Sequence, residues 1–230
     1  MQNQLISSHV LPTPSPPPEP ETDFKNEKIV IPKRKSWIKI VQRLLKELDG
    51  RDKMMKTIQY FIKILLHYKL IRAKHWSTMA SQFSMTRKIL RLGTAVGPLQ
   101  EIEPKLNYHT AILLNEIING VSDDIFCFHK LGFVSTSIGA RAEIISAYCW
   151  FIGILNDIKD QVQSLKKLQR NNGDKDKIFL AEISIIKLLM DAVFCACDIY
   201  HPSYSASAQA WSGFFSGLLA GYKLWIKFSL

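Results

Sequence analysis

The side chains able to do chemistry are few in this sequence and lie far apart along it. All four cysteines, Cys127, Cys149, Cys195 and Cys197, fall in apolar stretches with helical periodicity. Cys195 and Cys197 are two residues apart, which places them about 200° apart around a helix and makes them a poor pair of metal ligands. We therefore expect all four thiols to be reduced, either in a core or facing a membrane.

The histidines and acidic residues point no more strongly to catalysis. Asp123-Asp124 follows Ser122, so we interpret this pair as favourable charge at the start of a helix rather than as a catalytic dyad. The sequence contains no Gly-rich phosphate loop, nucleophile elbow or metal-spaced cluster. These patterns predict a protein that is not an enzyme and that holds no cofactor or metal. Five histidines are isolated from one another: His67, His75, His109, His129 and His201.

Basic residues are concentrated in the first half of the chain. Residues 1–100 contain 18 Lys or Arg and 7 Asp or Glu, whereas residues 101–230 contain 12 and 13. Such an excess favours an anionic partner, either nucleic acid or the anionic surface of a membrane. Because the second half is nearly neutral and becomes more apolar toward its end, we predict a membrane and no nucleic acid. The alternative, a soluble nucleic-acid binder, would form a salt-sensitive complex.

The chain divides near residue 35 into two parts of different composition. Residues 1–35 carry six prolines between positions 12 and 20 together with several lysines, which predicts a disordered basic tail. Thr13-Pro14 and Ser15-Pro16 are minimal proline-directed phosphorylation sites, although an unregulated tether fits equally well. Residues 36–230 form the second part, which we interpret as one helical membrane domain.

Apolar residues recur at three- and four-residue spacing through this second part, and no segment alternates as a strand would. We predict an all-α, membrane-associated bundle with amphipathic N-terminal helices and hydrophobic C-terminal helices. Asp49-Gly50 and Gly120 are interpreted as breaks, with Asp49 as an N-cap, and Asp174 is expected to cap a late helix. The predicted helices are 36–48, the segment after Gly50, 69–92, 105–119, 122–132, 141–170, 174–200 and 205–227.

The helices between residues 37 and 92 combine apolar stripes with many lysines and arginines, as helices lying in a membrane interface do. In the 69–92 segment Arg87 interrupts the apolar face. A soluble amphipathic bundle helix accounts for this pattern equally well. If the segment inserts into a membrane, the residues expected to meet lipid are Trp76, Met79, Phe83, Lys88, Leu90 and Arg91.

The most hydrophobic stretch lies near the C-terminus, where Ile199–Tyr222 contains no Asp, Glu, Lys or Arg. It is long enough to span a membrane and anchor the chain, although a buried core helix is the alternative. Small residues recur every four positions and leave one side of the helix bare for close helix packing. The pattern leaves open whether the partner helix belongs to the same chain, and we predict self-association at the face formed by Gly213, Gly217 and Gly221.

Two other patterns stay open on sequence alone. Ile144–Asn156 is uncharged over 13 residues and fits a core helix, an interfacial segment or a short span. Lys187, Asp191 and Asp198 form a narrow polar stripe on an otherwise apolar helix. The stripe fits the solvent-exposed side of a bundle helix, or the lining of a membrane pore.

Two stretches of the basic half resemble the signature of a known family. Gly50-Arg51-Asp52-Lys53 leads into a basic amphipathic helix that contains Gln59 and Tyr60, and Phe83–Gly93 contains an Arg-Lys-x-x-Arg-x-Gly step. Weaker matches are Lys130-Leu131-Gly132, Trp150, Asp191 and the Gly-rich terminal segment. Over about residues 37–227 the chain resembles the peroxin eleven family. The signature residues are Gly50, Arg51, Asp52, Lys53, Gln59 and Tyr60.

The resemblance implies a protein of the peroxisomal membrane that promotes peroxisome elongation, proliferation and fission. Family members self-associate and insert an amphipathic helix, here about residues 69–92, into the cytosolic leaflet. The implied partners are anionic lipid headgroups, further copies of the chain, and a dynamin-related GTPase with its membrane adaptor. The basic first half favours a cytosolic N-terminus. The alternative function is a pore for small metabolites, lined by Lys187, Asp191 and Asp198.

Overall fold

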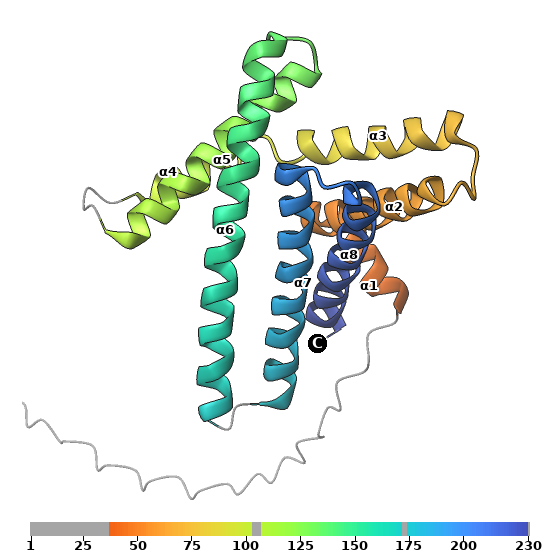
Figure 1. Ribbon diagram of the computed structural model, residues 1–230. Helices are drawn as coiled ribbons and strands as arrows, with labels where there is room; N and C mark the ends of the chain where they lie inside the picture. The colour runs from red at the N-terminus through yellow and green to blue at the C-terminus, as the bar shows by residue number, and fades with distance from the viewer. Residues whose placement is uncertain (1–36, 103–106, 172–173, 230) are drawn as a thin grey trace, which may run out of the picture. The chain divides into compact units, whose positions relative to one another are not determined.

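The computed structural model describes residues 37–102, 107–171 and 174–229, and within these ranges every regular element is an α-helix (Figure 1). The all-α prediction is therefore confirmed for the described residues, whereas the tail predicted for residues 1–35 lies outside them. The helices are α1 (Trp37–Lys46), α2 (Leu48–His67), α3 (Ala73–Ile89), α4 (Val96–Glu101), α5 (Tyr108–Lys130), α6 (Thr136–Arg170), α7 (Lys175–Tyr200) and α8 (Ser205–Ser229).

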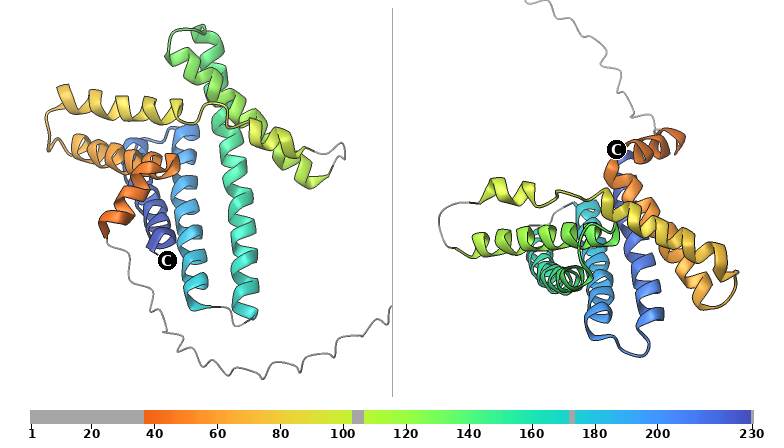
Figure 2. Two further views of the ribbon diagram at one scale, coloured as in Figure 1. Left: turned by 180° about the vertical axis from the view of Figure 1, so that it is seen from behind. Right: turned by 90° about the horizontal axis from the view of Figure 1, so that it is seen from above.

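Helices α6, α7 and α8 run side by side with α7 in the middle (Figure 1). Helix α5 turns back on α6 and packs along it as far as Asn156, whose side chain accepts a hydrogen bond from the Tyr108 hydroxyl (2.7 Å). Helix α2 packs against α8 and carries α3 folded back on it, and both run across the direction of α6 and α7 (Figure 2). This arrangement brings together polar residues of α2, α7 and α8 that are far apart in the sequence.

Helix α2 begins earlier than predicted. Glu47, not Asp49, occupies the N-cap position with extended backbone, and Gly50 lies inside the first turn. A Cβ atom at Gly50 would strike the carbonyl group of Leu44, because α1 meets α2 at this turn. The glycine therefore serves the close approach of two helices and does not end one.

The break predicted at Gly120 is also wrong, for a related reason. Helix α5 is continuous through Gly120, where a Cβ atom would lie only 3.0 Å from the backbone nitrogen of Ala95. This glycine admits the turn that precedes α4. Pro98 lies in the first turn of α4, where a helix needs no backbone donor. A small residue in the sequence does not indicate whether a helix ends there or whether a neighbouring segment packs close to it.

Two helices have a side chain that caps their first turn by a hydrogen bond. Asp174 caps α7 as predicted, because its carboxylate accepts a hydrogen bond from the backbone N–H of Asp176 (3.1 Å). Asn107 caps α5 by accepting from the backbone N–H of Thr110 (2.8 Å). Such caps satisfy donors that the first turn of a helix leaves unpaired. Helix α6 begins at Thr136 rather than at residue 141, and is the longest of the described helices.

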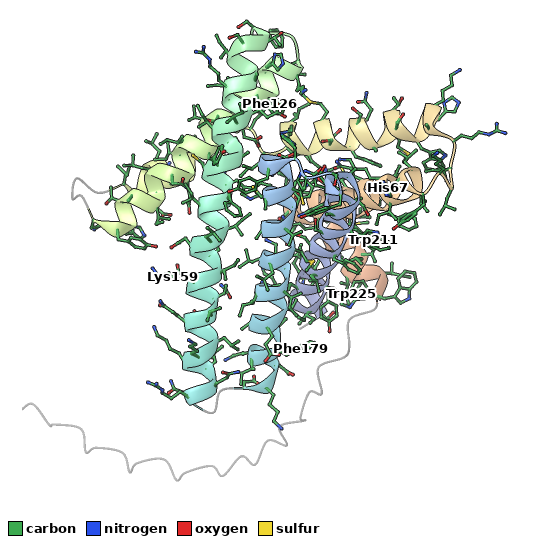
Figure 3. All side chains as sticks on the ribbon, viewed as in Figure 1. His67, Phe126, Lys159, Phe179, Trp211 and Trp225 are labelled. Carbon is green, nitrogen blue, oxygen red and sulfur yellow. The ribbon has the colours of Figure 1, made fainter. Side chains whose placement is uncertain are left out.

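Many large apolar side chains lie on the surface of the described part of this protein. Among the described residues 37 large apolar side chains are exposed, against 19 buried apolar residues. Phe179 of α7 and Trp211 of α8 are examples on the outer surface (Figure 3). The interior meanwhile holds charged side chains, including Asp52, Arg87 and Asp191. Exposed apolar side chains in this number, together with charged side chains inside, are typical of a helical protein surrounded by lipid.

Among the described helices, α6 is the one long and apolar enough to cross a bilayer, and only 17% of its most apolar window is buried inside the protein. The C-terminal helix α8, which the sequence predicts as the anchor, does not meet this criterion, and its role as the anchor stays a prediction. Helix α8 is instead covered on one side by α2 and on another by α7. The uncharged Ile144–Asn156 stretch, which the sequence left open, lies within α6.

The bare side of α8 is used for packing within the chain. A Cβ atom at Gly213 would lie 2.7 Å from the Tyr60 ring, and one at Gly217 would lie 2.8 Å from the Thr57 hydroxyl, both on α2. Gly221 has no neighbouring atom within 4 Å of the same position. The first two glycines therefore bring α2 and α8 together, and only the third faces open space.

This difference gives a test with a matched control. Replacing Gly213 by valine (G213V) should lower the free energy of unfolding by about 1–3 kcal/mol, because the buried Tyr60 ring cannot move aside. G221V should be neutral or slightly stabilising, since valine favours a helix over glycine by a few tenths of a kcal/mol. Melting temperatures in an uncharged detergent, followed by circular dichroism, measure both. Equal melting temperatures for the two variants would contradict this packing.

Candidate functional site

A buried charged contact joins α2 to α3. The Arg87 guanidinium donates through Nε to Asp52 Oδ1 (2.9 Å) and through NH1 to Gln59 Oε1 (2.9 Å). The side chains of Arg87 and Asp52 are only 9% and 8% exposed. Burial by itself raises the pKa of Asp52, but Arg87, Lys53 and Arg91 outweigh it and hold that pKa below the ordinary aspartate value. The pair is therefore charged at neutral pH and fixes α3 on α2.

A second polar network joins α2, α7 and α8. The Lys56 ammonium donates to Asp191 Oδ1 (2.8 Å) and to the Ser216 hydroxyl (2.7 Å), while Lys187 donates to the other oxygen of Asp191 (2.9 Å). The Ser216 hydroxyl also donates to Asp191. Burial lowers the pKa of Lys56 to about 8 against the opposing effect of Asp191. Three helices thus meet at one carboxylate.

These two networks lie in the wall of a polar cavity of about 560 Å³, which we call the central cavity. Six helices, α2, α3, α5, α6, α7 and α8, contribute to the wall or to the turns beside it. The stripe predicted on α7 faces this cavity, since Lys187, Asp191 and Asp198 all line it. Asp198 accepts a hydrogen bond from Gln209 of α8 (3.1 Å).

The family-signature residues are engaged in contacts that hold α2 in place. Gly50 admits Leu44, and Arg51 donates through Nε to the carbonyl of Leu45. Lys53 pairs with Asp49 at 3.0 Å and with Asp52 at 3.3 Å. The Tyr60 ring contacts Phe194 edge-on, with centroids 5.4 Å apart, and fills the space beside Gly213. Together with the Asp52–Arg87–Gln59 contact, these residues connect α2 to the helices packed against it.

The residues expected to meet lipid divide into two groups. Trp76 and Met79, in the first half of α3, are 41% and 40% exposed. Phe83 and Leu90 are half-buried. Lys88 pairs with Asp123 at 3.2 Å, and Arg91 donates to the carbonyl of Arg87 at 3.2 Å, so both cations contact the protein itself. The insertion of α3 into a membrane stays a prediction.

The environment of Arg87 differs from the one that the sequence predicts. The sequence placed it on the apolar face of the 69–92 segment, as an interruption of a surface that meets lipid. In the structure Arg87 is buried together with Ala80, whereas Trp76 and Met79, nearer the start of α3, are exposed. The arginine therefore holds the second half of α3 on the protein and does not lie among the exposed residues of its first half.

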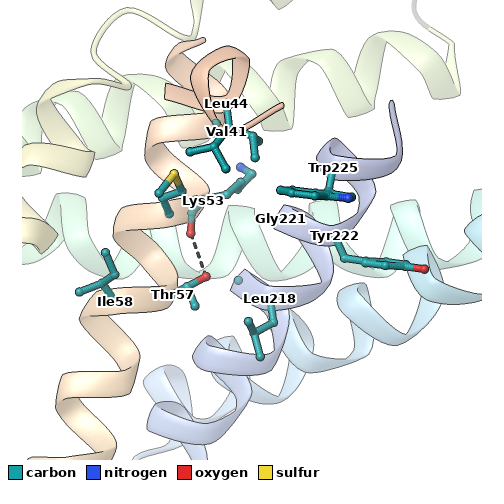
Figure 4. Close-up of a pocket in the computed structure, with 12 residues that line it drawn as sticks. Val41, Leu44, Lys53, Thr57, Ile58, Leu218, Gly221, Tyr222 and Trp225 are labelled. Atoms are coloured by element: carbon teal, nitrogen blue, oxygen red, sulfur yellow. Dashed lines mark hydrogen bonds between the residues drawn. The ribbon is translucent and has the colours of Figure 1, made fainter. Parts of the chain in front are cut away.

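A second hollow lies between α1, α2 and α8 and is almost entirely apolar (Figure 4). It has a volume of about 530 Å³, and its wall includes Val41 and Met54 on one side and Leu218 and Trp225 on the other. Gly221, the glycine of α8 without a close neighbour, also faces it. Its lining suits an apolar chain and offers no catalytic group.

Sequence reasoning missed two partners of Asp191, Lys56 and Ser216. Lys56 appeared only as one of the lysines on the polar side of its helix, and Ser216 as one small residue beside the glycines. Their joint contact with Asp191 spans 135 positions for Lys56 and 25 for Ser216. The one available signal was a charged stripe on α7, because buried charges require partners of opposite charge. Among residues 37–102, 107–171 and 174–229, no three His, Cys, Asp or Glu side chains are grouped to hold a metal.

The fold and the polar centre define a helical protein of the membrane-associated class. The sequence model of the family described as Peroxisomal biogenesis factor 11 (PEX11) matches residues 38–225, and this chain belongs to that family. It is 23% identical to Peroxisomal membrane protein 11A of Arabidopsis thaliana, over 87% of this chain and 97% of that protein. It is 25% identical to the Peroxisomal membrane protein 11 homolog of Dictyostelium discoideum, over 55% of each chain. No solved structure matches the chain.

The role assigned to Arg87 can be tested against its neighbour. R87M leaves Asp52 charged and buried without its main partner, so the free energy of unfolding should fall by about 3–5 kcal/mol. R91M removes a guanidinium that is 46% exposed and 4.0 Å from the same carboxylate. The loss in R91M should stay below about 1 kcal/mol. Thermal melts of both variants in uncharged detergent measure these losses of stability. Similar losses in R87M and R91M would show that the buried contact of Arg87 does not hold α3 on α2.

Proposed function

We propose that this chain is a peroxisomal membrane protein that promotes peroxisome elongation, proliferation and fission. In this proposal α3 lies in the cytosolic leaflet, the N-terminus is cytosolic, and several copies of the chain associate. The names of the two relatives support the location, since both are peroxisomal membrane proteins. The family membership supports a role in the biogenesis of the organelle rather than in catalysis.

The observation that supports the mechanism is the exposure of the first half of α3. Trp76 and Met79 are exposed beside Arg72 and Lys74, which are exposed as well. Tryptophan next to basic residues suits the boundary between anionic headgroups and acyl chains. Because the inner side of α3 is held on α2 by Arg87, insertion would add volume to one leaflet only. Added volume in one leaflet favours curvature, and curvature precedes elongation.

Self-association and fission complete the proposal. Gly213 and Gly217 are occupied by α2 within the chain, so contacts between copies would use the open side near Gly221 and the exposed apolar residues of α8, such as Phe215 and Leu218. A dynamin-related GTPase and its membrane adaptor would then cut the elongated membrane. Both partners are proposed from the family resemblance.

The double variant W76D/M79D tests the curvature mechanism in the full-length protein. It should bind anionic vesicles at least about tenfold more weakly, because two apolar side chains no longer enter the membrane. Tubules seen by negative-stain electron microscopy should become correspondingly rare. Vesicle flotation measures binding, and circular dichroism checks that the helices persist.

The matched control is V96D/L99D on α4. Val96 and Leu99 are 55% and 58% exposed, so this variant adds the same charge outside α3. It should bind and tubulate vesicles as the unaltered protein does. If W76D/M79D tubulates as well as this control, α3 does not generate the curvature.

A pore for small metabolites is the second candidate, and the central cavity favours it. The Lys187, Asp191 and Asp198 stripe faces that polar space rather than lipid. Asp198 is the exposed member, and among the described residues its one hydrogen-bond partner is Gln209, so D198N should preserve the fold. A pore predicts altered ion selectivity in planar bilayers and unchanged tubulation for D198N. Identical currents in the two proteins, or none, would remove this candidate.

A further inference from the structure

The central cavity carries more positive than negative charge. Its wall contains eight Lys or Arg side chains and five Asp or Glu side chains, an excess of three positive charges. Like charges gathered in a partly enclosed space repel one another and attract anions.

The carboxylates of the cavity are mostly engaged by particular cations. Asp52 holds Arg87, Asp123 holds Lys88 at 3.2 Å, and Asp191 holds both Lys56 and Lys187. These pairs engage three of the five acidic groups of the wall, while Asp198 accepts from Gln209 and Glu143 is exposed.

Two lysines of the wall have no carboxylate partner within the part of the chain that the structure describes. The Lys63 ammonium lies over the Tyr60 ring, 4.9 Å from its centroid, and the Lys130 ammonium lies over the Phe126 ring at 5.0 Å. Asp198 acts on Lys63 at longer range but accepts its hydrogen bond from Gln209. A lysine ammonium has three donors, and a ring face satisfies them only weakly.

The region around Phe126 shows the local excess most clearly. Phe126 is buried, and its ring has Lys88 at 4.3 Å and Lys130 at 5.0 Å from the centroid. Only Asp123 pairs with a cation there. An anion beside these lysines would offer acceptor oxygens to Lys130, which has no carboxylate partner among the described residues. The aromatic part of the wall, Trp150 and Phe194, would remain for an uncharged portion of the ligand.

We propose that the central cavity binds an anionic ligand carrying one or two phosphate groups, held by Lys63 and Lys130. A phosphate monoester carries a charge of about −1.5 to −2 at neutral pH, so one or two of them match an excess of three positive charges. The phosphate belongs either to a soluble compound or to the headgroup of a lipid. The site does not depend on whether the protein bends membranes or forms a pore.

The test uses the full-length protein in micelles of uncharged detergent and isothermal titration calorimetry. One arm titrates inorganic pyrophosphate, and the other titrates a short-chain, water-soluble phosphatidylinositol phosphate. Saturable binding in the first arm identifies a soluble phosphate compound, and saturable binding in the second arm alone identifies a lipid headgroup. Either ligand should also raise the melting temperature of the native protein, because it binds the folded state.

The variants K63Q/K130Q and K166Q/K167Q separate the cavity from general charge. Both remove two positive charges from exposed lysines, but Lys166 and Lys167 lie on α6 and do not line the cavity. K63Q/K130Q should bind the probe at least about tenfold more weakly, as expected for losing charged hydrogen bonds. K166Q/K167Q should bind it unchanged, and both should melt as the native protein does. Absence of saturable binding in both arms, or equal weakening in the two variants, would overturn the proposal.

Discussion

Arg87 lies inside the protein against Asp52 and Gln59, and the position of α3 depends on this contact. A charged pair removed from water is stable only when its other donors and acceptors are also satisfied, and Gln59 meets that condition. The contact turns the side of α3 that carries Ala80 and Arg87 inward. Trp76 and Met79 lie nearer the start of the same helix and stay exposed, and this exposed half is the part that the proposed function requires.

The same principle explains why the polar residues lie at the centre of this protein. In lipid, apolar surfaces gain little by meeting one another, so helices are held together by close packing and by polar contacts. Here Asp191 supplies the polar contact by binding Lys56 and Ser216 from two other helices, while Gly213 and Gly217 supply the close packing. The apolar side chains left outside are then available to the membrane.

Helix α2 connects the two regions to which we assign functions. On one side it holds α3, whose outer face is proposed to enter the membrane. On another it contributes Asp52, Lys56 and Lys63 to the central cavity, which is proposed to hold a phosphate-bearing ligand. The signature that identifies the family lies on this helix, and its residues contact α1, α3 and α8. A change in α2 is therefore expected to disturb both regions.

The sequence by itself determined the all-α class, the basic first half, the Asp174 cap and the family signature, because periodicity and local side-chain chemistry act over a few residues. Only the tertiary structure decided the roles of Gly50, Gly120 and Arg87. A glycine gives the same signal whether it breaks a helix or admits a neighbour, and an arginine on an apolar face has no visible partner in the sequence. The central cavity likewise needs six helices to meet, and no local pattern records which faces will meet.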